Sequence, residues 1–176
     1  KPERRGGPRR PRCLLGPRML PLLLPFFAGA INTTGTILIL KARGTNLCID
    51  VPGAPSDSAV LLKNCNDGET QQWYFDNGAW KMQNALEPKK CIDAGDMSDG
   101  NRIMLWGCNG YNQQVWGYDP AMGTIYLAKS AGSNASNADM CLDFTENPGD
   151  GSQLIVWHCN GLSDQQFDIS PAVAIA

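Results

Sequence analysis

An aspartate and a glutamine recur three times around a pair of cysteines, and in two of the three cases a tryptophan stands two residues before the second cysteine. A hexose presents one patch of C–H bonds and several hydroxyls, so a site for a neutral sugar needs an apolar ring face beside polar groups. A carboxylate accepts hydrogen bonds from neighbouring hydroxyls, and an amide both donates and accepts. Brought together, the three residue types would supply what such a site needs.

These residues belong to three sequence repeats. The repeats read "LCIDVPGAPSDSAVLLKNCNDGETQQWYF", "KCIDAGDMSDGNRIMLWGCNGYNQQVWGY" and "MCLDFTENPGDGSQLIVWHCNGLSDQQFDI". Each has Cys-apolar-Asp, a turn rich in Gly, Pro, Ser and Asp, an apolar run, a second Cys, and a Gln-x-aromatic whose Gln follows that Cys by 6 residues. The period is 43 residues and then about 50. A recurring unit of this size predicts a repeat architecture.

The cysteines of the repeats predict disulfides. Six cysteines allow fifteen connectivities, and the repetition favours bridges within each repeat, namely Cys48 with Cys65, Cys91 with Cys108, and Cys141 with Cys159. Each loop would stabilise the fold by roughly 3 kcal/mol in the chain-entropy model. Zinc is the rival interpretation, but the chain has no C-x-x-C and only one histidine, His158. We therefore expect no metal and no cofactor.

The elements that would position these residues are short strands. Runs such as "TILIL", "AVLLK", "WYF" and "TIYLA" are strand-length and apolar, and no helical stripe of ten or more residues appears. They predict an all-β fold with about four strands per repeat and about twelve in all. One such unit cannot bury its apolar face alone, so three are expected to share a core, in a sheet closed on itself.

The threefold Cys-x-Asp…Cys…Gln-x-Trp pattern resembles the ricin B-type lectins, the Gln-x-Trp β-trefoils that also occur as carbohydrate-binding modules. The resemblance covers roughly residues 36–170 and implies a β-trefoil of three pseudo-equivalent repeats, at about 36–77, 78–120 and 121–170. It also implies a core position for the aromatic residues of the Gln-x-aromatic motifs, which here are Trp73, Trp116 and Phe167.

The resemblance also implies the sugar-binding residues. They are, in repeat two, Asp93, Trp106, Gln113 and Gln114, and in repeat three, Asp143, Trp157, Asp164 and Gln165. The family usually has Asn where Gln113 and Asp164 stand, and Asn112 could take that place only if the loop shifts by one residue. Repeat one keeps Asp50 and Gln71 but has Lys63 at the aromatic position and Thr70 at the Asn position. Without an aromatic face, repeat one is expected to be scaffold.

Each site residue also has a purely structural interpretation. Aspartates that precede turns often bond only to nearby backbone, and we favour this for Asp50. Trp106 and Trp157 could be ordinary half-buried strand residues. Their recurrence at the sugar-stacking position, and their absence from repeat one, favours a role in binding for both tryptophans and for Asp93 and Asp143. His158 is expected to be a bystander at the rim.

The N-terminus carries a separate signal. Residues 1–18 hold seven of the fifteen Lys and Arg, and "MLPLLLPFFAGA" follows at residues 19–30. A basic flank, a short apolar run and Ala-x-Ala predict a secretory signal peptide, hence a secreted, extracellular domain. In an alternative interpretation, residues 1–18 are upstream sequence and Met19 is the start. Either way the mature chain would begin near Ile31, with residues 31–35 an N-terminal extension and 171–176 a C-terminal tail.

The remaining chain is acidic, with eight Lys or Arg against sixteen Asp or Glu from Ile31 onward. Such a charge balance argues against nucleic acid as a partner, and the apolar run is too short for membrane insertion. No pair of carboxylates is placed by the repeats as a glycosidase requires, and no G-x-S-x-G is present, so we predict no enzyme.

The expected partners are glycans, of galactose, N-acetylgalactosamine or xylan type by family analogy. Two alternatives stay open: a β-trefoil protease inhibitor that presents the "VPGAPSDS" loop, and an interaction module whose sugar sites have decayed.

Overall fold

The computed structural model describes residues 36–53, 58–76, 79–82, 89–132 and 135–172, and these residues form twelve strands, four from each repeat. Repeat one contributes β1 (Leu38–Ala42), β2 (Leu47–Asp50), β3 (Leu61–Asn64) and β4 (Trp73–Asp76). Repeat two contributes β5 (Ala79–Met82), β6 (Lys90–Asp93), β7 (Met104–Gly107) and β8 (Trp116–Asp119). Repeat three contributes β9 (Thr124–Leu127), β10 (Met140–Phe144), β11 (Ser152–His158) and β12 (Phe167–Pro171). The all-β prediction is confirmed.

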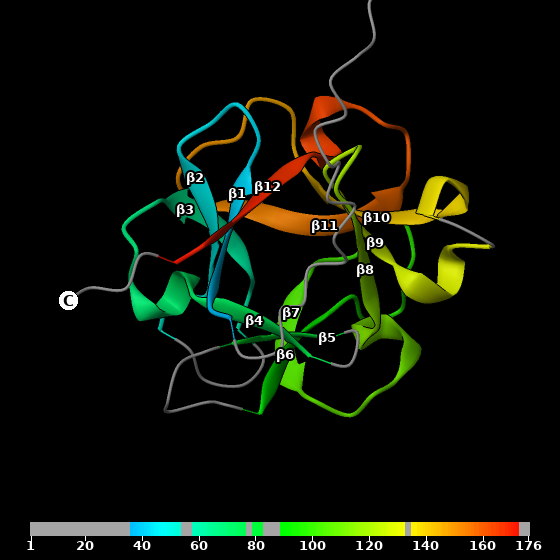
Figure 1. Cartoon of the computed structure of the whole chain (residues 1–176), viewed down its shortest axis with the longest axis horizontal. Coiled ribbons are helices and arrows are strands. Elements are labelled where there is room, and N and C mark those ends of the chain that lie inside the picture. Colours follow the sequence, from blue (N-terminus) through cyan, green and yellow to red (C-terminus); the bar gives the residue numbers. More distant parts are fainter. Residues whose placement is uncertain (1–35, 54–57, 77–78, 83–88, 133–134, 173–176) are drawn as a thin grey trace, which may run out of the picture. The chain divides into compact units, whose positions relative to one another are not determined.

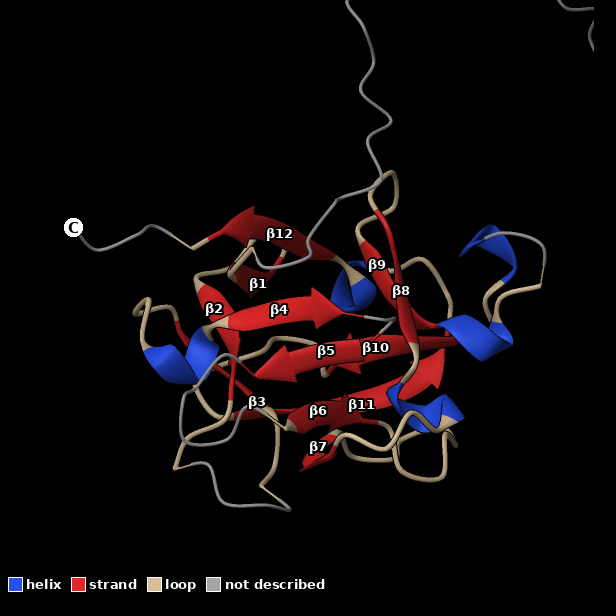
Figure 2. Cartoon of the chain, turned by 60° about the horizontal axis from the view of Figure 1, so that its bottom comes forward, coloured by secondary structure: helices blue, strands red, loops and turns tan. Residues whose placement is uncertain are grey.

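The only helical elements in these residues are single 3-10 turns, drawn blue in Figure 2. Three of them directly precede the strand that begins with the Gln-x-aromatic residue: η1 (Glu69–Gln71), η2 (Asn112–Gln114) and η5 (Ser163–Gln165). The other two, η3 (Ala128–Ser130) and η4 (Ala135–Asn137), follow β9. No helix in the described ranges is long and apolar enough to cross a membrane.

The strands form one curled sheet with β-trefoil topology. Each repeat contains a central hairpin, β2–β3, β6–β7 or β10–β11, with antiparallel pairing throughout. The first strand of the chain, β1, pairs with the last, β12, over five residues, so that the first and third repeats meet (Figure 1). The chain divides into residues 1–31 and 32–176, and the predicted leader lies outside the described residues.

The three hairpins meet at the pseudo-threefold axis through backbone hydrogen bonds. The N–H of Val60 donates to the carbonyl of Ile103 at 3.2 Å, Ile103 donates to Leu154 at 3.0 Å, and Leu154 donates to Val60 at 3.2 Å. The Gln153 side-chain amide donates to the same three carbonyls, at 2.9–3.3 Å. This cycle fixes the three repeats to one another, so each hairpin sits at a defined position beside the next repeat.

The core is built from the apolar faces of all three repeats. Trp73, Trp116 and Phe167 are at most 2% exposed, which confirms their predicted core position. The two indole N–H groups donate to the carbonyls of Ile49 and Ile92, at 3.0 and 3.1 Å. Phe167 has no such donor and instead packs edge-on against Phe144, with ring centroids 5.6 Å apart. A phenyl ring thus fills the third core position without leaving a buried N–H.

All three predicted disulfides form within their repeats, Cys48–Cys65, Cys91–Cys108 and Cys141–Cys159. Each joins the first strand of a central hairpin to the residue just after its second strand. The bridge therefore closes the open end of the hairpin, next to the Cys-x-Asp aspartate.

Candidate functional site

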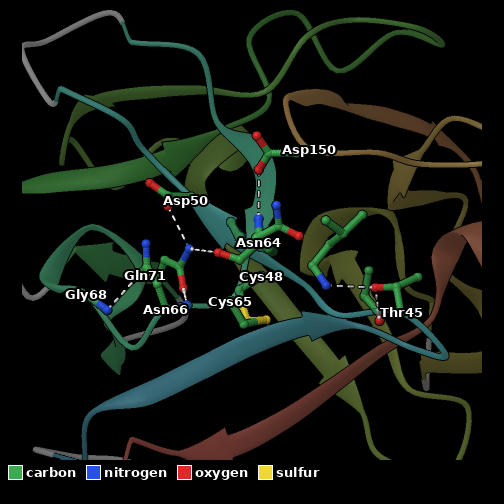
Figure 3. Close-up of a disulfide and its surroundings, with 12 residues drawn as sticks. Thr45, Cys48, Asp50, Asn64, Cys65, Asn66, Gly68, Gln71 and Asp150 are labelled. Atoms are coloured by element: carbon green, nitrogen blue, oxygen red, sulfur yellow. Dashed lines mark hydrogen bonds between the residues drawn. A yellow bond between two sulfur atoms is a disulfide. The ribbon is translucent and has the colours of Figure 1, made fainter.

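Each repeat holds its aspartate through its motif glutamine. The Nε2 of Gln71 donates to Asp50 at 2.7 Å (Figure 3), Gln114 donates to Asp93 at 2.7 Å, and Gln165 donates to Asp143 at 2.8 Å. All six side chains are buried, the aspartates at 4–5% exposure and the glutamines at 0–1%. A charge-assisted bond to one carboxylate oxygen fixes the orientation of the other.

The three glutamines are buried, and both their amide hydrogens and their carbonyl oxygens form hydrogen bonds within the protein. Each Nε2 also donates to a backbone carbonyl at 2.9 Å, and each Oε1 accepts a backbone N–H five residues upstream at 2.8–2.9 Å. An amide offers two donors and one acceptor oxygen, and all are engaged here. Gln114 and Gln165, predicted in the sugar-binding set, are therefore placed beneath their carboxylates, where they can support a site by orienting Asp93 and Asp143.

The tryptophans at the aromatic position lie at the surface. Trp106 and Trp157 are each 42% exposed, in contrast to the buried core tryptophans. Trp106 pairs across its hairpin with Cys91, and Trp157 pairs with Cys141. Because alternate strand residues share a face, each tryptophan lies on the same face of its hairpin as the aspartate two residues after that cysteine. The structure thus brings Trp106 near Asp93 and Trp157 near Asp143.

In repeat two, the second carboxylate oxygen of Asp93 accepts the N–H of Gly95 at 2.7 Å. Gly95 has a φ of +59°, a conformation that favours glycine, and the turn continues with Asn101 Nδ2 donating to the Ala94 carbonyl at 2.6 Å. The Ala94 N–H donates to the carbonyl of Gln113 at 3.0 Å, as Val51 N–H does to Thr70 in repeat one. The loop therefore keeps the register of repeat one, and the exposed Asn112 does not replace Gln113 by a one-residue shift.

In repeat three, two further carboxylates act on the buried aspartate, Asp143. Burial raises the pKa of Asp143 to about 6, the hydrogen bond from Gln165 opposes this, and the charges of Asp164 and Asp99 raise it further. Asp164 is half-buried, and its Oδ1 is fully buried without a hydrogen-bond partner. It lines a hollow of about 340 Å³ together with Glu146 and Leu162.

The repeat-three tryptophan is flanked by a turn from repeat two. Asp99 accepts the backbone N–H of His158 at 2.7 Å and forms a hydrogen bond with its Nδ1 at 2.7 Å. At the next residue, Gly100, an added Cβ would lie 3.5 Å from the Trp157 ring, so the backbone approaches the indole closely. His158, expected at the rim of the site and not as a ligand, is exposed and holds Asp99 in the turn beside Trp157.

Repeat one has the same arrangement with a different outcome. Its aromatic position is Lys63, whose Nζ pairs with Asp150 of repeat three at 2.6 Å. Asp150 also accepts the N–H of Asn64 at 2.8 Å (Figure 3). Asp50 is held by Gln71, but its Oδ1 is buried without a partner. On the strand opposite Asp50, repeat one thus has the Lys63–Asp150 salt bridge in place of an aromatic face.

Asp99 and Asp150 are the positions that sequence reasoning missed. Both precede a glycine with positive φ, Gly100 and Gly151, and both accept a backbone N–H of the following repeat in the threefold arrangement. The recurring Asp-Gly just before the apolar run was visible in repeats two and three. Its partner was not, because that partner comes from another repeat.

Two further predictions concern other chemistry. In the described part of the chain no three His, Cys, Asp or Glu side chains are grouped so that they could hold a metal ion. The loop assigned to the inhibitor alternative includes residues 54–57, which lie outside the described residues, so that alternative stays a prediction.

The model of the ricin-type beta-trefoil lectin domain matches residues 36–167, more than half of the chain. The chain belongs to this family. Carbohydrate binding is accordingly the function class of this lectin domain. A search of curated proteins finds no significant match.

Solved structures agree with the fold of this ricin-type lectin domain. The earthworm R-type lectin C-half, solved in complex with GalNAc, matches with a TM-score of 0.62 and 19% identity over 77% of this chain and 98% of that one. The Abrus precatorius agglutinin matches with a TM-score of 0.61 and 24% identity over 78% of this chain and 48% of that one. ThreeFoil, a designed threefold symmetric protein, has a TM-score of 0.60 and 23% identity over 76% and 96%.

Proposed function

We propose that this ricin-type lectin domain binds glycans at two places, in repeats two and three. The observation that carries the proposal is that an exposed tryptophan and a glutamine-held aspartate share one hairpin face in these two repeats, whereas repeat one has Lys63 paired with Asp150. Trp106 and Trp157 would stack on the C–H face of a sugar ring, and Asp93 and Asp143 would accept hydrogen bonds from its hydroxyls.

The fixed carboxylates support this proposal energetically. A side chain that is already ordered loses little conformational entropy when a ligand binds, and such preorganisation increases affinity. Gln114 and Gln165 supply this order at Asp93 and Asp143, so their place in the predicted site is that of positioning residues. Gln113 and Asp164, in the turns beside the carboxylates, would contact the sugar at the position where the family usually has Asn.

The ligand class follows from the family and from structural neighbours. The earthworm lectin was solved with GalNAc and, as a mutant, with 6'-sialyllactose, and a Momordica charantia protein was solved with α-methyl-D-galactoside. We propose galactose- or N-acetylgalactosamine-type glycans, or xylan, for this chain. Two sites on one rigid body could bind one branched glycan together and gain avidity. Secretion through the segment at residues 19–30 is part of the same proposal.

A glycan array with the oxidised full-length chain tests the proposal. We expect binding to neutral glycans by the wild type and its loss in the double variant Trp106→Ala/Trp157→Ala, which stays folded because both side chains are exposed. Lys63→Ala is the matched control, since it truncates the equivalent position of repeat one and should leave binding unchanged. Unchanged glycan binding by the folded double variant would remove both tryptophans from the site.

A further inference from the structure

The two proposed sites differ at the residue that precedes the positioning glutamine. Repeat two has Gln113 and repeat three has Asp164, each inside the 3-10 turn that leads to Gln114 or Gln165. An amide donates and accepts hydrogen bonds without charge, whereas a carboxylate accepts only and is negative. Of the two positions, the Cys-x-Asp aspartate and the residue before the glutamine, repeat two therefore has one carboxylate, Asp93, and repeat three has two, Asp143 and Asp164.

Among the described residues, no Lys, Arg or His forms a salt bridge with Asp143 or Asp164. Asp143 is 5% exposed, and its carboxylate accepts a hydrogen bond from the neutral amide of Gln165. Asp164 Oδ1 is buried without a partner, although the residue as a whole is half-buried and can be approached from solvent. A charge that has lost water without gaining a donor is costly, so a cation at the accessible part of this carboxylate would be favourable.

The surroundings add negative charge. Glu146 lines the hollow of about 340 Å³ that Asp164 also lines, and Asp99 accepts the backbone N–H of His158, the residue after Trp157. The nearby cation-forming group is His158, which is already engaged with Asp99 through its Nδ1 at 2.7 Å. In a partly buried place such a set of like charges attracts cations and repels anions.

We propose that the repeat-three site selects glycans that carry a free, protonated amino group, such as non-acetylated hexosamine residues, and disfavours sialylated, sulfated or uronic-acid glycans. Asp164 is the residue that determines this specificity, through an ammonium-to-carboxylate hydrogen bond. N-acetylation removes the charge and so removes the preference. The inference rests on the proposed function, because it concerns the ligand of the Trp157 site.

Single-site variants of the oxidised full-length chain separate the two sites. Trp106→Ala retains only the repeat-three site, and Trp157→Ala retains only the repeat-two site. Each is titrated with hexosamine oligosaccharides of gluco and galacto configuration, in free-amino and fully N-acetylated form, and with sialylated counterparts. We expect Trp106→Ala to bind one free-amino ligand about 10-fold more tightly than its N-acetylated form, as a hydrogen bond to a charged group allows, and Trp157→Ala to show no such preference.

Two substitutions change the residue before the positioning glutamine, one in each repeat. Asp164→Asn in the Trp106→Ala chain should abolish the amino preference, so that the free-amino and N-acetylated ligands bind that chain with equal affinity. Gln113→Asp in the Trp157→Ala chain should create the preference in repeat two. Thermal unfolding of each variant checks that the fold is retained. Higher salt should reduce the preference without affecting neutral ligands.

The outcomes distinguish this inference from the function on which it rests. Equal binding of amino and N-acetylated ligands by Trp106→Ala would overturn the inference and leave the lectin function standing. A preference that survives Asp164→Asn would overturn the role of Asp164. Absence of binding to every glycan by both single-site chains and by the wild type would overturn the proposed function together with the inference.

Discussion

Repeats one and three contain the same aspartate and glutamine pair but present opposite surfaces beside it. In repeat three, Asp99 from the preceding repeat holds the backbone next to Trp157 and leaves the indole 42% exposed. In repeat one, the equivalent Asp150 reaches the side chain at the aromatic position itself and pairs with Lys63 at 2.6 Å. The neighbouring repeat thus supports the backbone beside Trp157 in repeat three, whereas it neutralises the charge of Lys63 in repeat one.

The comparison shows that the aspartate–glutamine pair is not by itself a mark of sugar binding. It occurs with the same bond lengths in all three repeats, along with the disulfide and the buried aromatic residue. These features belong to the repeat as a folding unit. Binding depends on the side chain two residues before the second cysteine, which is free to vary because it lies at the surface.

The largest expected effect is a difference in the free energy of unfolding between variants of a buried and of an exposed tryptophan. Trp73→Ala should lower the free energy of unfolding by about 4 kcal/mol, because it opens a large cavity and removes the donor to the Ile49 carbonyl. Trp106→Ala should cost less than about 1 kcal/mol, as expected for an exposed side chain. Chemical denaturation of both variants measures the difference, and similar losses would contradict the assignment of one to the core and the other to the surface.

The next effect concerns the positioning glutamines. Gln71→Ala and Gln114→Ala should each lower the free energy of unfolding by about 2–3 kcal/mol, because each leaves a buried carboxylate without its donor. Only Gln114→Ala should also weaken glycan binding, measured in the Trp157→Ala background. If Gln71→Ala reduced binding as strongly, repeat one would have to be counted as a site.

A smaller effect follows pH. The pKa of Asp143 is raised to about 6 in the folded chain, above its ordinary value of 3.8, so the folded state binds more protons between these values. Stability therefore rises as pH falls from about 6 to about 4, by at most about 1.4 kcal/mol per pH unit for this one group. The groups that act on Asp143 are Gln165, Asp164 and Asp99.

Asp143→Asn isolates this contribution. The difference in unfolding free energy between wild type and variant, measured from pH 4 to pH 7, should show the slope, since other carboxylates cancel in the subtraction. Sugar binding by the Trp106→Ala chain should weaken below pH 6, because protonation removes an acceptor. A pH-independent difference in stability would show that Asp143 titrates in the ordinary range.

The smallest effect is a gain of binding in repeat one. Lys63→Trp/Thr70→Asn supplies the missing aromatic face and amide, and it is best placed in the Trp106→Ala/Trp157→Ala background, where other binding is absent. We expect weak restored binding on the array, below that of either natural site, because Asp150 remains beside the new tryptophan. No restoration in the folded chain would mean that the aromatic residue alone does not separate repeat one from the others.

Much of this fold could be predicted from the sequence because the same pattern of residues occurs in all three repeats. The strands, the disulfides and the core positions of Trp73, Trp116 and Phe167 all follow from features that recur in register. The backbone hydrogen bonds among Val60, Ile103 and Leu154 could not be predicted, since they join different repeats and use no distinctive side chain.

For the site, too, features that recur within each repeat could be predicted, whereas contacts between repeats could not. The aspartates and tryptophans recur at fixed spacing, so they could be assigned to one site, and the register of the hairpins then placed them on one face. The hydrogen bonds of the glutamines could not be predicted from the sequence, because most of their partners are backbone groups. The Lys63–Asp150 pair was hidden too, because its members are 87 residues apart and only the packing of repeat three on repeat one brings them together.

The central claim, that Trp106 and Trp157 are the sugar-contacting tryptophans, is tested most directly by NMR titration of the indole N–H signals with the glycan that binds best. We predict shifts for Trp106 and Trp157 and none for Trp73 and Trp116, whose N–H groups are buried on the Ile49 and Ile92 carbonyls. Saturable binding that leaves the Trp106 and Trp157 signals in place would contradict the account and move the ligand to another part of the domain.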